Sequence, residues 1–168
     1  MANIRKQRKP NRIIKNKKSA KVELYNRIGE PVAYAIIDIE DIDKITGKKW
    51  CYHGGYAKHG PNGFQMHKAI TGEVCDHINH NRLDNRKANL RTATHYQNMY
   101  NLPKPRHNSS GYVGVHFFKR TGLYRAYLSI CDKDFHIGYF NTPEEAAYIR
   151  DQFVMQIRGK FAVTNFEY

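Results

Sequence analysis

One segment of the sequence brings together carboxylate, imidazole and amide side chains that could hydrolyse a phosphodiester. Asp76 and His77 are adjacent, and Asn98 follows further along the chain. Hydrolysis needs a base for the attacking water, a Lewis acid on the phosphate and stabilisation of the leaving oxygen. Oxygens of Asp76 and Asn98 suit one hard divalent cation, Mg²⁺ or Mn²⁺. His77, whose imidazole has an ordinary pKa of about 6.5, is suited to act as the base.

A hairpin followed by a helix would position these groups. Residues 74–78 read as a short strand, a polar loop follows, and residues 90–93 can pair back as a second strand. Thr94 and Gln97 form a capping box, so a short helix is predicted from His95. Because neighbouring side chains of a strand point to opposite faces, Asp76 and His77 can divide the roles of ligand and base. The pattern predicts a ββα hairpin.

These residues resemble the HNH endonuclease family, in its phage and intron homing branch. The resemblance covers about residues 66–101 and rests on Asp76-His77, Asn89-Leu90-Arg91 and Asn98. It implies that Asp76 and Asn98 are metal ligands, that His77 is the general base, and that Asn89 ties the loop and orients that base. Asn98 stands where many relatives have His, which favours one Mg²⁺-like ion, and no structural zinc is expected. His80 stands where relatives often have Gly.

Several neighbouring residues have two open interpretations. His67 could assist catalysis at the phosphate or form a structural hydrogen bond between helix start and loop. Three arginines could clamp DNA phosphates, although one of the last two could instead brace Asp84: Arg82, Arg86 and Arg91.

The overall charge favours a polyanionic partner. The chain has 168 residues and a formal net charge of +13. Residues 1–21 hold nine basic and no acidic residues, and they are predicted to form a flexible basic arm. No apolar run is long enough for a membrane helix, and the N-terminus lacks a secretory signal. We expect a protein that is not secreted and does not enter a membrane.

A second domain is predicted after a Pro- and Ser-containing linker at residues 103–110. Residues 112–118, 123–130 and 135–140 read as strands joined by hairpin turns. A helix follows, with Thr142 as N-cap, Pro143 at the first position and Glu145 completing a capping box, and it ends at Gly159. The predicted fold class is α+β: a nuclease domain at 22–102 with its ββα-metal motif at about 74–101, then a three-stranded antiparallel sheet packed on one helix at 111–168.

The second domain resembles the plant APETALA/ethylene-response-factor DNA-binding domain over about residues 109–167. The resemblance rests on stretches such as Gly138-Tyr139-Phe140 and Asn141-Thr142-Pro143, and it implies that the sheet enters the major groove. Alternation places Val115, Phe117, Ala126, Leu128 and Ile137 toward the helix. The outward residues and hairpin tip are expected to contact DNA: His116, Phe118, Lys119, Arg120, Arg125, Tyr127, Ser129 and His136. Ordinary surface aromatics remain the alternative for Phe118 and Tyr127.

Together these observations predict a sequence-specific, metal-dependent endonuclease of double-stranded DNA, of homing type, that nicks one strand per active site. If it is encoded by a bacteriophage, it would act in the cytoplasm of the bacterial host. A non-catalytic DNA-binding regulator that uses the same C-terminal domain is the main alternative, and an RNA-binding accessory protein is a third. The sequence leaves monomer and dimer equally open.

Overall fold

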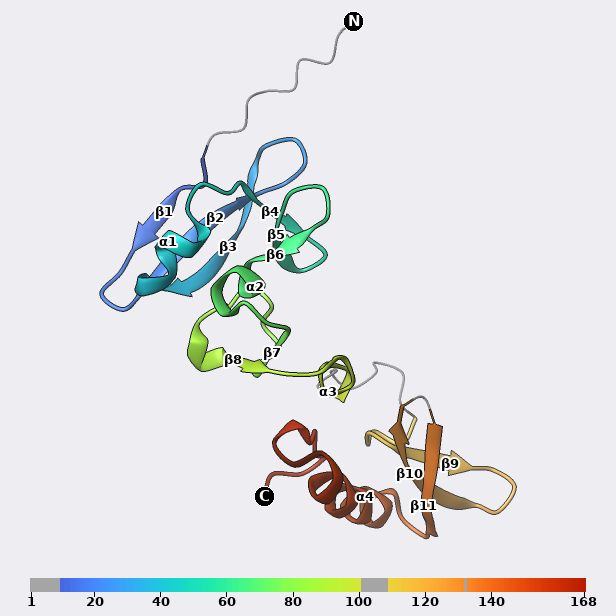
Figure 1. Cartoon of the computed structure of the whole chain (residues 1–168). Helices are drawn as coiled ribbons and strands as arrows, with labels where there is room; N and C mark the ends of the chain where they lie inside the picture. The colour runs from blue at the N-terminus through green and yellow to red at the C-terminus, as the bar shows by residue number, and fades with distance from the viewer. Residues whose placement is uncertain (1–9, 101–108, 132) are drawn as a thin grey trace, which may run out of the picture. The chain divides into compact units, whose positions relative to one another are not determined.

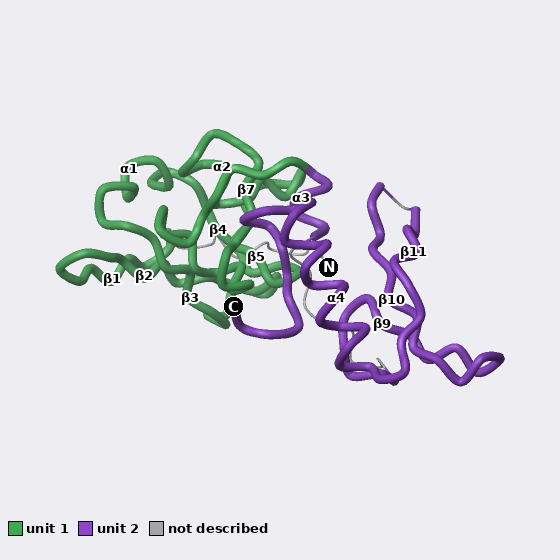
Figure 2. Tube along the Cα trace, turned by 90° about the horizontal axis from the view of Figure 1, so that it is seen from below, with its two compact units in different colours: residues 1–94 green, residues 95–168 purple. Residues whose placement is uncertain are grey.

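A computed structural model describes residues 10–100, 109–131 and 133–168. The fold is a mixture of α-helices and β-strands in two compact units, residues 1–94 and residues 95–168 (Figure 2). Of the helices in the described part of the chain, none is both long and apolar enough to cross a membrane. Most of the predicted linker at 103–110 lies outside the described residues.

The first unit is built on a twisted sheet (Figure 1). Its described strands are β1 (Ile13–Lys15), β2 (Ser19–Tyr25), β3 (Pro31–Asp38), β4 (Trp50–His53), β5 (Tyr56–His59) and β6 (Phe64–Gln65). β2 pairs with β1 and β3 along antiparallel registers, and it meets β4 at Tyr25 and Cys51. Ala20, Val22 and Leu24 alternate along β2 and are buried in the main core around Trp50.

The prediction of a flexible arm over residues 1–21 is wrong for its second half. Residues 1–9 lie outside the described part, but β1 and the first residues of β2 fall within 13–21. Asn11 fastens this end of the chain, because its amide donates to the carbonyls of Glu23 (2.6 Å) and Trp50 (2.8 Å) and accepts from the Trp50 amide (2.7 Å). The basic composition predicted an arm, but the apolar residues Ile13 and Ala20 lie between the basic ones and belong to strands β1 and β2.

Short helices connect the sheet to the hairpin. A 3₁₀ turn (Ile39–Asp41) and α1 (Ile42–Ile45) follow β3, and α2 (Met66–Thr71) follows β6. Asp41 is fully buried, with its Oδ1 at 2.8 Å from Lys44 Nζ and 3.3 Å from Lys87 Nζ. Because Lys87 lies in the loop between the two hairpin strands, this ion pair ties that loop to the turn that follows β3.

The hairpin consists of β7 (Cys75–His77) and β8 (Leu90–Thr92), with a 3₁₀ turn (Lys87–Asn89) before β8. The strands are antiparallel and place Asp76 opposite Arg91. Their loop docks on β3, since the Ile36 amide donates to Leu83 O (2.7 Å) and the Asn85 amide donates to Ile36 O (2.7 Å). Both strands are shorter than predicted. Helix α3 (His95–Tyr100) begins at the predicted residue and belongs to the second unit.

The second unit contains β9 (Val115–Phe118), β10 (Leu123–Ile130) and β11 (Lys133–Phe140), in the antiparallel order β11-β10-β9. Helix α4 (Pro143–Arg158) packs on this sheet through Ala146 and Ala147, and a 3₁₀ turn (Gly159–Phe161) follows it. Thr142 Oγ1 accepts from the Glu145 amide (3.2 Å), so the predicted cap is confirmed.

Strand β9 starts later than the predicted residue 112. Gly114 has a φ of +72°, and a Cβ there would lie 2.7 Å from the carbonyl oxygen of Tyr127. The Tyr127 amide donates to Gly114 O at 2.9 Å. The chain therefore turns at Gly114 before entering the sheet, in a conformation that suits glycine.

Candidate active site

Asn89 fastens the loop that connects the two hairpin strands. Its Oδ1 accepts from the Asn79 amide (2.9 Å), and its Nδ2 donates to Asp84 O (2.8 Å). Its backbone carbonyl accepts from the Ile78 amide at 2.9 Å. Because Asn89 is only 7% exposed, these bonds are shielded from water and hold the loop from the inside.

His77 lies buried at the end of β7, with an exposure of 5%. Its Nε2 is 3.2 Å from Asn85 Oδ1. Burial lowers the pKa of His77, and the hydrogen bond with Asn85 opposes that shift without reversing it. The imidazole is therefore predominantly neutral at neutral pH, which is the form that a general base needs.

His67, on α2, stands against His77 with ring centroids 5.0 Å apart and nearly perpendicular planes. Burial, reinforced by the charges of His77 and Lys68, lowers the pKa of His67 to about 4. A neutral ring offers no positive charge to a phosphate at neutral pH. The structure packs its ring beside the rings of His77 and Tyr56.

Two arginines of the hairpin form ion pairs with its aspartates. Arg91 donates to Asp76 Oδ2 through Nε (2.8 Å) and Nη2 (2.6 Å). Arg86 donates to both carboxylate oxygens of Asp84, through Nε (2.7 Å) and Nη2 (2.6 Å). These hydrogen bonds lower the pKa of Asp84. The residue that braces Asp84 is thus Arg86, while Arg91 steadies the predicted metal ligand.

Arg82 stacks on an aromatic ring that the sequence did not single out. Its guanidinium carbon lies 4.8 Å from the ring centroid of Tyr56, which starts β5. The same ring faces His67 at 5.9 Å and His77 at 6.2 Å. The Tyr56 ring thus contacts both the guanidinium of Arg82 and the rings of His67 and His77. No sequence signal near the motif could have revealed it, because β5 comes well before the hairpin.

The oxygen donors that could bind a metal suit a hard cation that also keeps water and substrate phosphate as ligands. In the described ranges, no three His, Cys, Asp or Glu side chains are grouped to hold an ion. Both bonds from Arg91 fall on the same oxygen of Asp76. Mg²⁺ is commonly held by one or two carboxylates together with water and substrate phosphate. The Asp76 carboxylate on the hairpin therefore fits Mg²⁺ or Mn²⁺ better than a structural zinc, whose sites are built mainly from Cys and His. Asn98, the proposed amide ligand, lies on α3.

The second unit presents a mixed aromatic and basic face on its sheet. Pairing places Arg125 beside both His116 and Tyr139, and the Tyr139 ring lies 4.7 Å from His136 and 5.8 Å from Phe118. The alternation did not predict Tyr139 on this face. A bulge between Ala126 and Tyr127 shifts the register of β11, so its residues 136 and 139 share one side.

The remaining predicted contacts lie on or near this face. Tyr127 is under the guanidinium of Arg125 (5.8 Å), Arg120 is over Phe118 (5.6 Å), and Ser129 is bonded to Asp134. Lys119 lies in the turn after β9. Phe117 was expected to face the helix, but it is 37% exposed and packs on Tyr124 (5.1 Å). The small core around Val115 and Ala126 does not extend to it.

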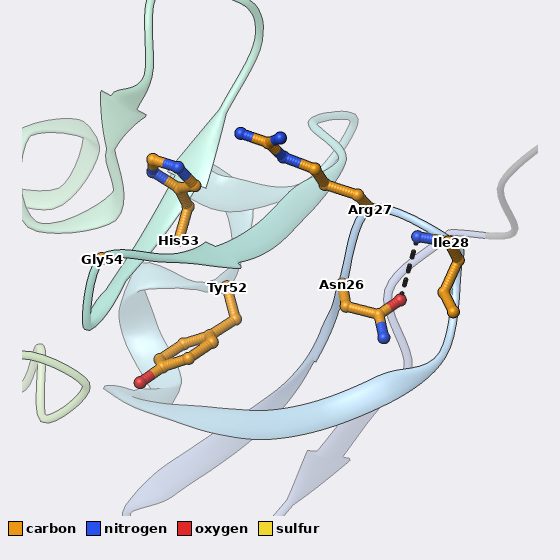
Figure 3. Close-up of a pocket in the computed structure, with 6 residues that line it drawn as sticks. All are labelled: Asn26, Arg27, Ile28, Tyr52, His53 and Gly54. Carbon is orange, nitrogen blue, oxygen red and sulfur yellow. Dashed lines mark hydrogen bonds between the residues drawn. The ribbon is translucent and has the colours of Figure 1, made fainter.

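A separate open hollow lies between two hairpin turns of the first unit. It is lined by Asn26, Arg27 and Ile28 after β2, by Tyr52 and His53 at the end of β4, and by Gly54 in the turn that follows (Figure 3). Asn26 Oδ1 accepts from the Ile28 amide (3.0 Å) and shapes the first turn. None of the lining residues belongs to the catalytic group predicted on the hairpin.

A family model described as HNH endonuclease matches residues 50–100. An uncharacterized HNH endonuclease of Acanthamoeba polyphaga mimivirus is 34% identical over 145 residues, which are 79% of this chain and 74% of the viral protein.

Plant proteins match a shorter stretch. APETALA2-like protein 2 of Oryza sativa is 39% identical over 62 residues, 37% of this chain, and an AP2-like ethylene-responsive transcription factor of Arabidopsis thaliana is similar to the same degree. The matched stretch spans only 14% and 13% of those plant proteins. No solved structure gives a significant match. The family model and the viral relative, which the chain matches over most of its length, show that this chain belongs to the HNH endonuclease family.

Proposed function

We propose that this chain is a metal-dependent, sequence-specific endonuclease of double-stranded DNA, of homing type. The observation that carries the proposal is the buried His77 imidazole, kept neutral beside the Asp76 carboxylate at the end of β7. Membership of the HNH endonuclease family supports the same chemistry. The homing role itself rests on the resemblance of the hairpin residues.

The side chains of the hairpin, together with Asn98 of α3, would share the chemistry as follows. His77 accepts a proton from water, whose oxygen forms the new bond to phosphorus while the bond to the leaving 3′ oxygen breaks. Asp76, steadied by Arg91, and Asn98 would hold a divalent cation. Such an ion, when bound, supplies Lewis-acid polarisation of the phosphate. Arg82, stacked on Tyr56, is placed in this scheme to contact a backbone phosphate.

Target recognition would belong to the second unit. Its sheet face carries Arg125 and Tyr127 next to the His136–Tyr139 pair, and two-stranded or larger β-ribbons fit the major groove. The similar plant proteins are an APETALA2-like protein and an AP2-like transcription factor, and we assign that likeness to residues 111–168. Because each chain has one His77 and one Asp76, each would nick one strand, and a double-strand break would need two chains or two events.

Mapping the ends that the full-length chain produces on fragmented DNA tests this function. With Mg²⁺, we expect new ends at one recurring sequence and on one strand. Asp76→Ala should remove these ends, while Asp43→Ala, which changes an exposed carboxylate of α1, should leave them unchanged. DNA that is shifted on a gel but never cut would contradict the proposal and favour the DNA-binding regulator.

A further inference from the structure

Asn85 has a polar side chain that contacts the proposed base directly. It is 1% exposed, and its Oδ1 is 3.2 Å from His77 Nε2. Its Nδ2 lies 3.2 Å from Leu83 O and 4.0 Å from Met66 Sδ. Asn89 binds the loop backbone instead, at the Asn79 amide and Asp84 O. Asn85 thus contacts the His77 ring, whereas the side chain of Asn89 bonds the loop backbone.

The neighbours of Asn85 determine which way its amide group faces. A backbone carbonyl oxygen only accepts hydrogen bonds, and a thioether sulfur is at most a weak acceptor. The NH₂ group must therefore face Leu83 O and Met66 Sδ, and the amide oxygen must face His77. An amide oxygen donates nothing, so the partner nitrogen has to carry the hydrogen. In a neutral imidazole, protonation of one nitrogen leaves the lone pair on the other.

We propose that Asn85 is a positioning residue that holds His77 as its Nε2–H tautomer, so that Nδ1 is the atom that takes the proton from water. This inference rests on the proposed function, because it names the atom that performs the base step. Leu83 O fixes the orientation of the Asn85 amide group. The amide oxygen then holds the hydrogen of the His77 ring on Nε2, so the lone pair is on Nδ1.

The backbone of Asn85 makes a separate contact that a side-chain substitution leaves in place. Its amide donates to Ile36 O at 2.7 Å, which docks the loop on β3. Asn85→Leu therefore removes the side-chain contact to His77 while keeping this backbone link. Met66→Leu is the matched control, because it removes only the sulfur neighbour, and exchanges between Met and Leu are usually tolerated in cores.

The first test is spectroscopic and needs neither metal nor DNA. The full chain is labelled with ¹⁵N at histidine, and one-bond N–H couplings are recorded at pH 8, with His77→Gln identifying the His77 signals. We expect the proton on Nε2 in the wild type and in Met66→Leu, and a mixture of tautomers in Asn85→Leu. A proton on Nδ1 in the wild type would overturn the inference whatever the protein does to DNA.

The second test separates positioning from a merely structural effect. In single-turnover cleavage, Asn85→Leu should lower the rate about 10- to 100-fold, less than His77→Ala does, with little change in the DNA concentration at half-maximal rate. In a His77→Ala background, Asn85→Leu should change nothing further. A further loss in that background would overturn the positioning role. Absence of cleavage by the wild type would instead overturn the proposed function, and the tautomer result would distinguish the two failures.

Discussion

Residue scale. His67 and His77 bury two imidazole rings against each other, and both have pKa values below the ordinary value. Burial that keeps a base neutral also penalises its protonation. An unfolded chain binds these protons near pH 6.5, whereas folded His67 binds its proton only near pH 4. The same contacts that suit His77 to catalysis should therefore make the first unit sensitive to acid.

The free energy of unfolding should fall as the pH drops from about 6.5 toward 4, because the unfolded chain binds more protons in that window. For His67 alone, the loss between pH 7 and pH 4 is roughly 2 to 3 kcal/mol. Urea unfolding followed by the fluorescence of Trp50, the single tryptophan, measures it. His67→Gln should flatten this part of the curve, while Asp84, whose pKa is lowered, acts below pH 4. Equal slopes for wild type and His67→Gln would contradict the prediction.

His80 adopts the left-handed backbone region, with a φ of 61°. Its amide donates to His77 O at 3.0 Å, which closes the turn after β7. Non-glycine residues pay a steric penalty in this region. This conformation gives a physical reason why a glycine would suit this position.

His80→Gly should raise the free energy of unfolding by about 0.5 to 1 kcal/mol, since glycine adopts this φ without strain. Urea unfolding at pH 8 provides the measurement. Asn81→Gly, one residue later, is the matched control and should not stabilise, because its side chain accepts from the Leu83 amide (3.1 Å). A lower stability for His80→Gly would show that the imidazole makes a contact worth more than the strain.

Element scale. The end of the second unit is fastened to α4 by one buried carboxylate. Asp151, fully buried, accepts from the amides of Asn165 (2.5 Å) and Phe166 (3.1 Å) and from Arg150 Nη1 (3.0 Å). Asn165 in turn bonds the backbone of Val113 at 2.7 Å. One side chain thus connects the helix, the C-terminal segment and the start of the sheet.

Asp151→Ala should destabilise the second unit by about 3 kcal/mol or more, because it leaves buried donors and the Arg150 charge without their acceptor. Hydrogen exchange at the Asn165 and Phe166 amides reports on this unit directly. We expect exchange there to accelerate at least about 100-fold. Glu167→Ala, which removes an exposed carboxylate, should leave the exchange unchanged. Unchanged protection in Asp151→Ala would exclude this fastening.

The sequence revealed elements whose signals are local. The cap at Thr142, the helix from His95 and the strands of the second sheet all follow from short patterns. The bulge that brings Tyr139 to the outer face of that sheet leaves no such pattern, because it arises from pairing between strands. Tyr56 and Asn85 were missed as site residues for a similar reason. Their positions depend on how β5 and the loop pack around His77, which spacing along the chain does not encode.

Whole-molecule scale. The two compact units divide the proposed tasks between them, with the general base His77 and the ligand Asp76 on the hairpin of residues 1–94 and sequence reading on the sheet of residues 95–168. Such a division predicts that substitutions on the sheet face change which DNA is bound, without changing the catalytic step that uses His77 as general base. The net charge of +13 adds a salt-dependent attraction to any DNA.

Arg125→Ala and Tyr127→Ala should each weaken binding to the target by about 1 to 3 kcal/mol, or about 5- to 150-fold, with a smaller effect on unrelated DNA. Titrations of both DNAs at several salt concentrations measure this. Arg125→Ala should reduce the salt slope by about 1 if it contacts a phosphate and leave it unchanged if it contacts a base. Tyr148→Ala, at an exposed aromatic of α4, is the control. Equal losses on target and unrelated DNA would contradict sequence reading by this face.

The most direct test of the central claim is cleavage of supercoiled DNA that contains the mapped target. The rates are compared for wild type with Mg²⁺, wild type with EDTA, and His77→Ala with Mg²⁺. We predict nicked circles from the first reaction alone, with the rate of His77→Ala reduced about 100- to 10,000-fold while its binding to the target is retained. Cleavage by His77→Ala at the wild-type rate, or undiminished cleavage in EDTA, would contradict a metal-dependent nuclease that uses this histidine as its base.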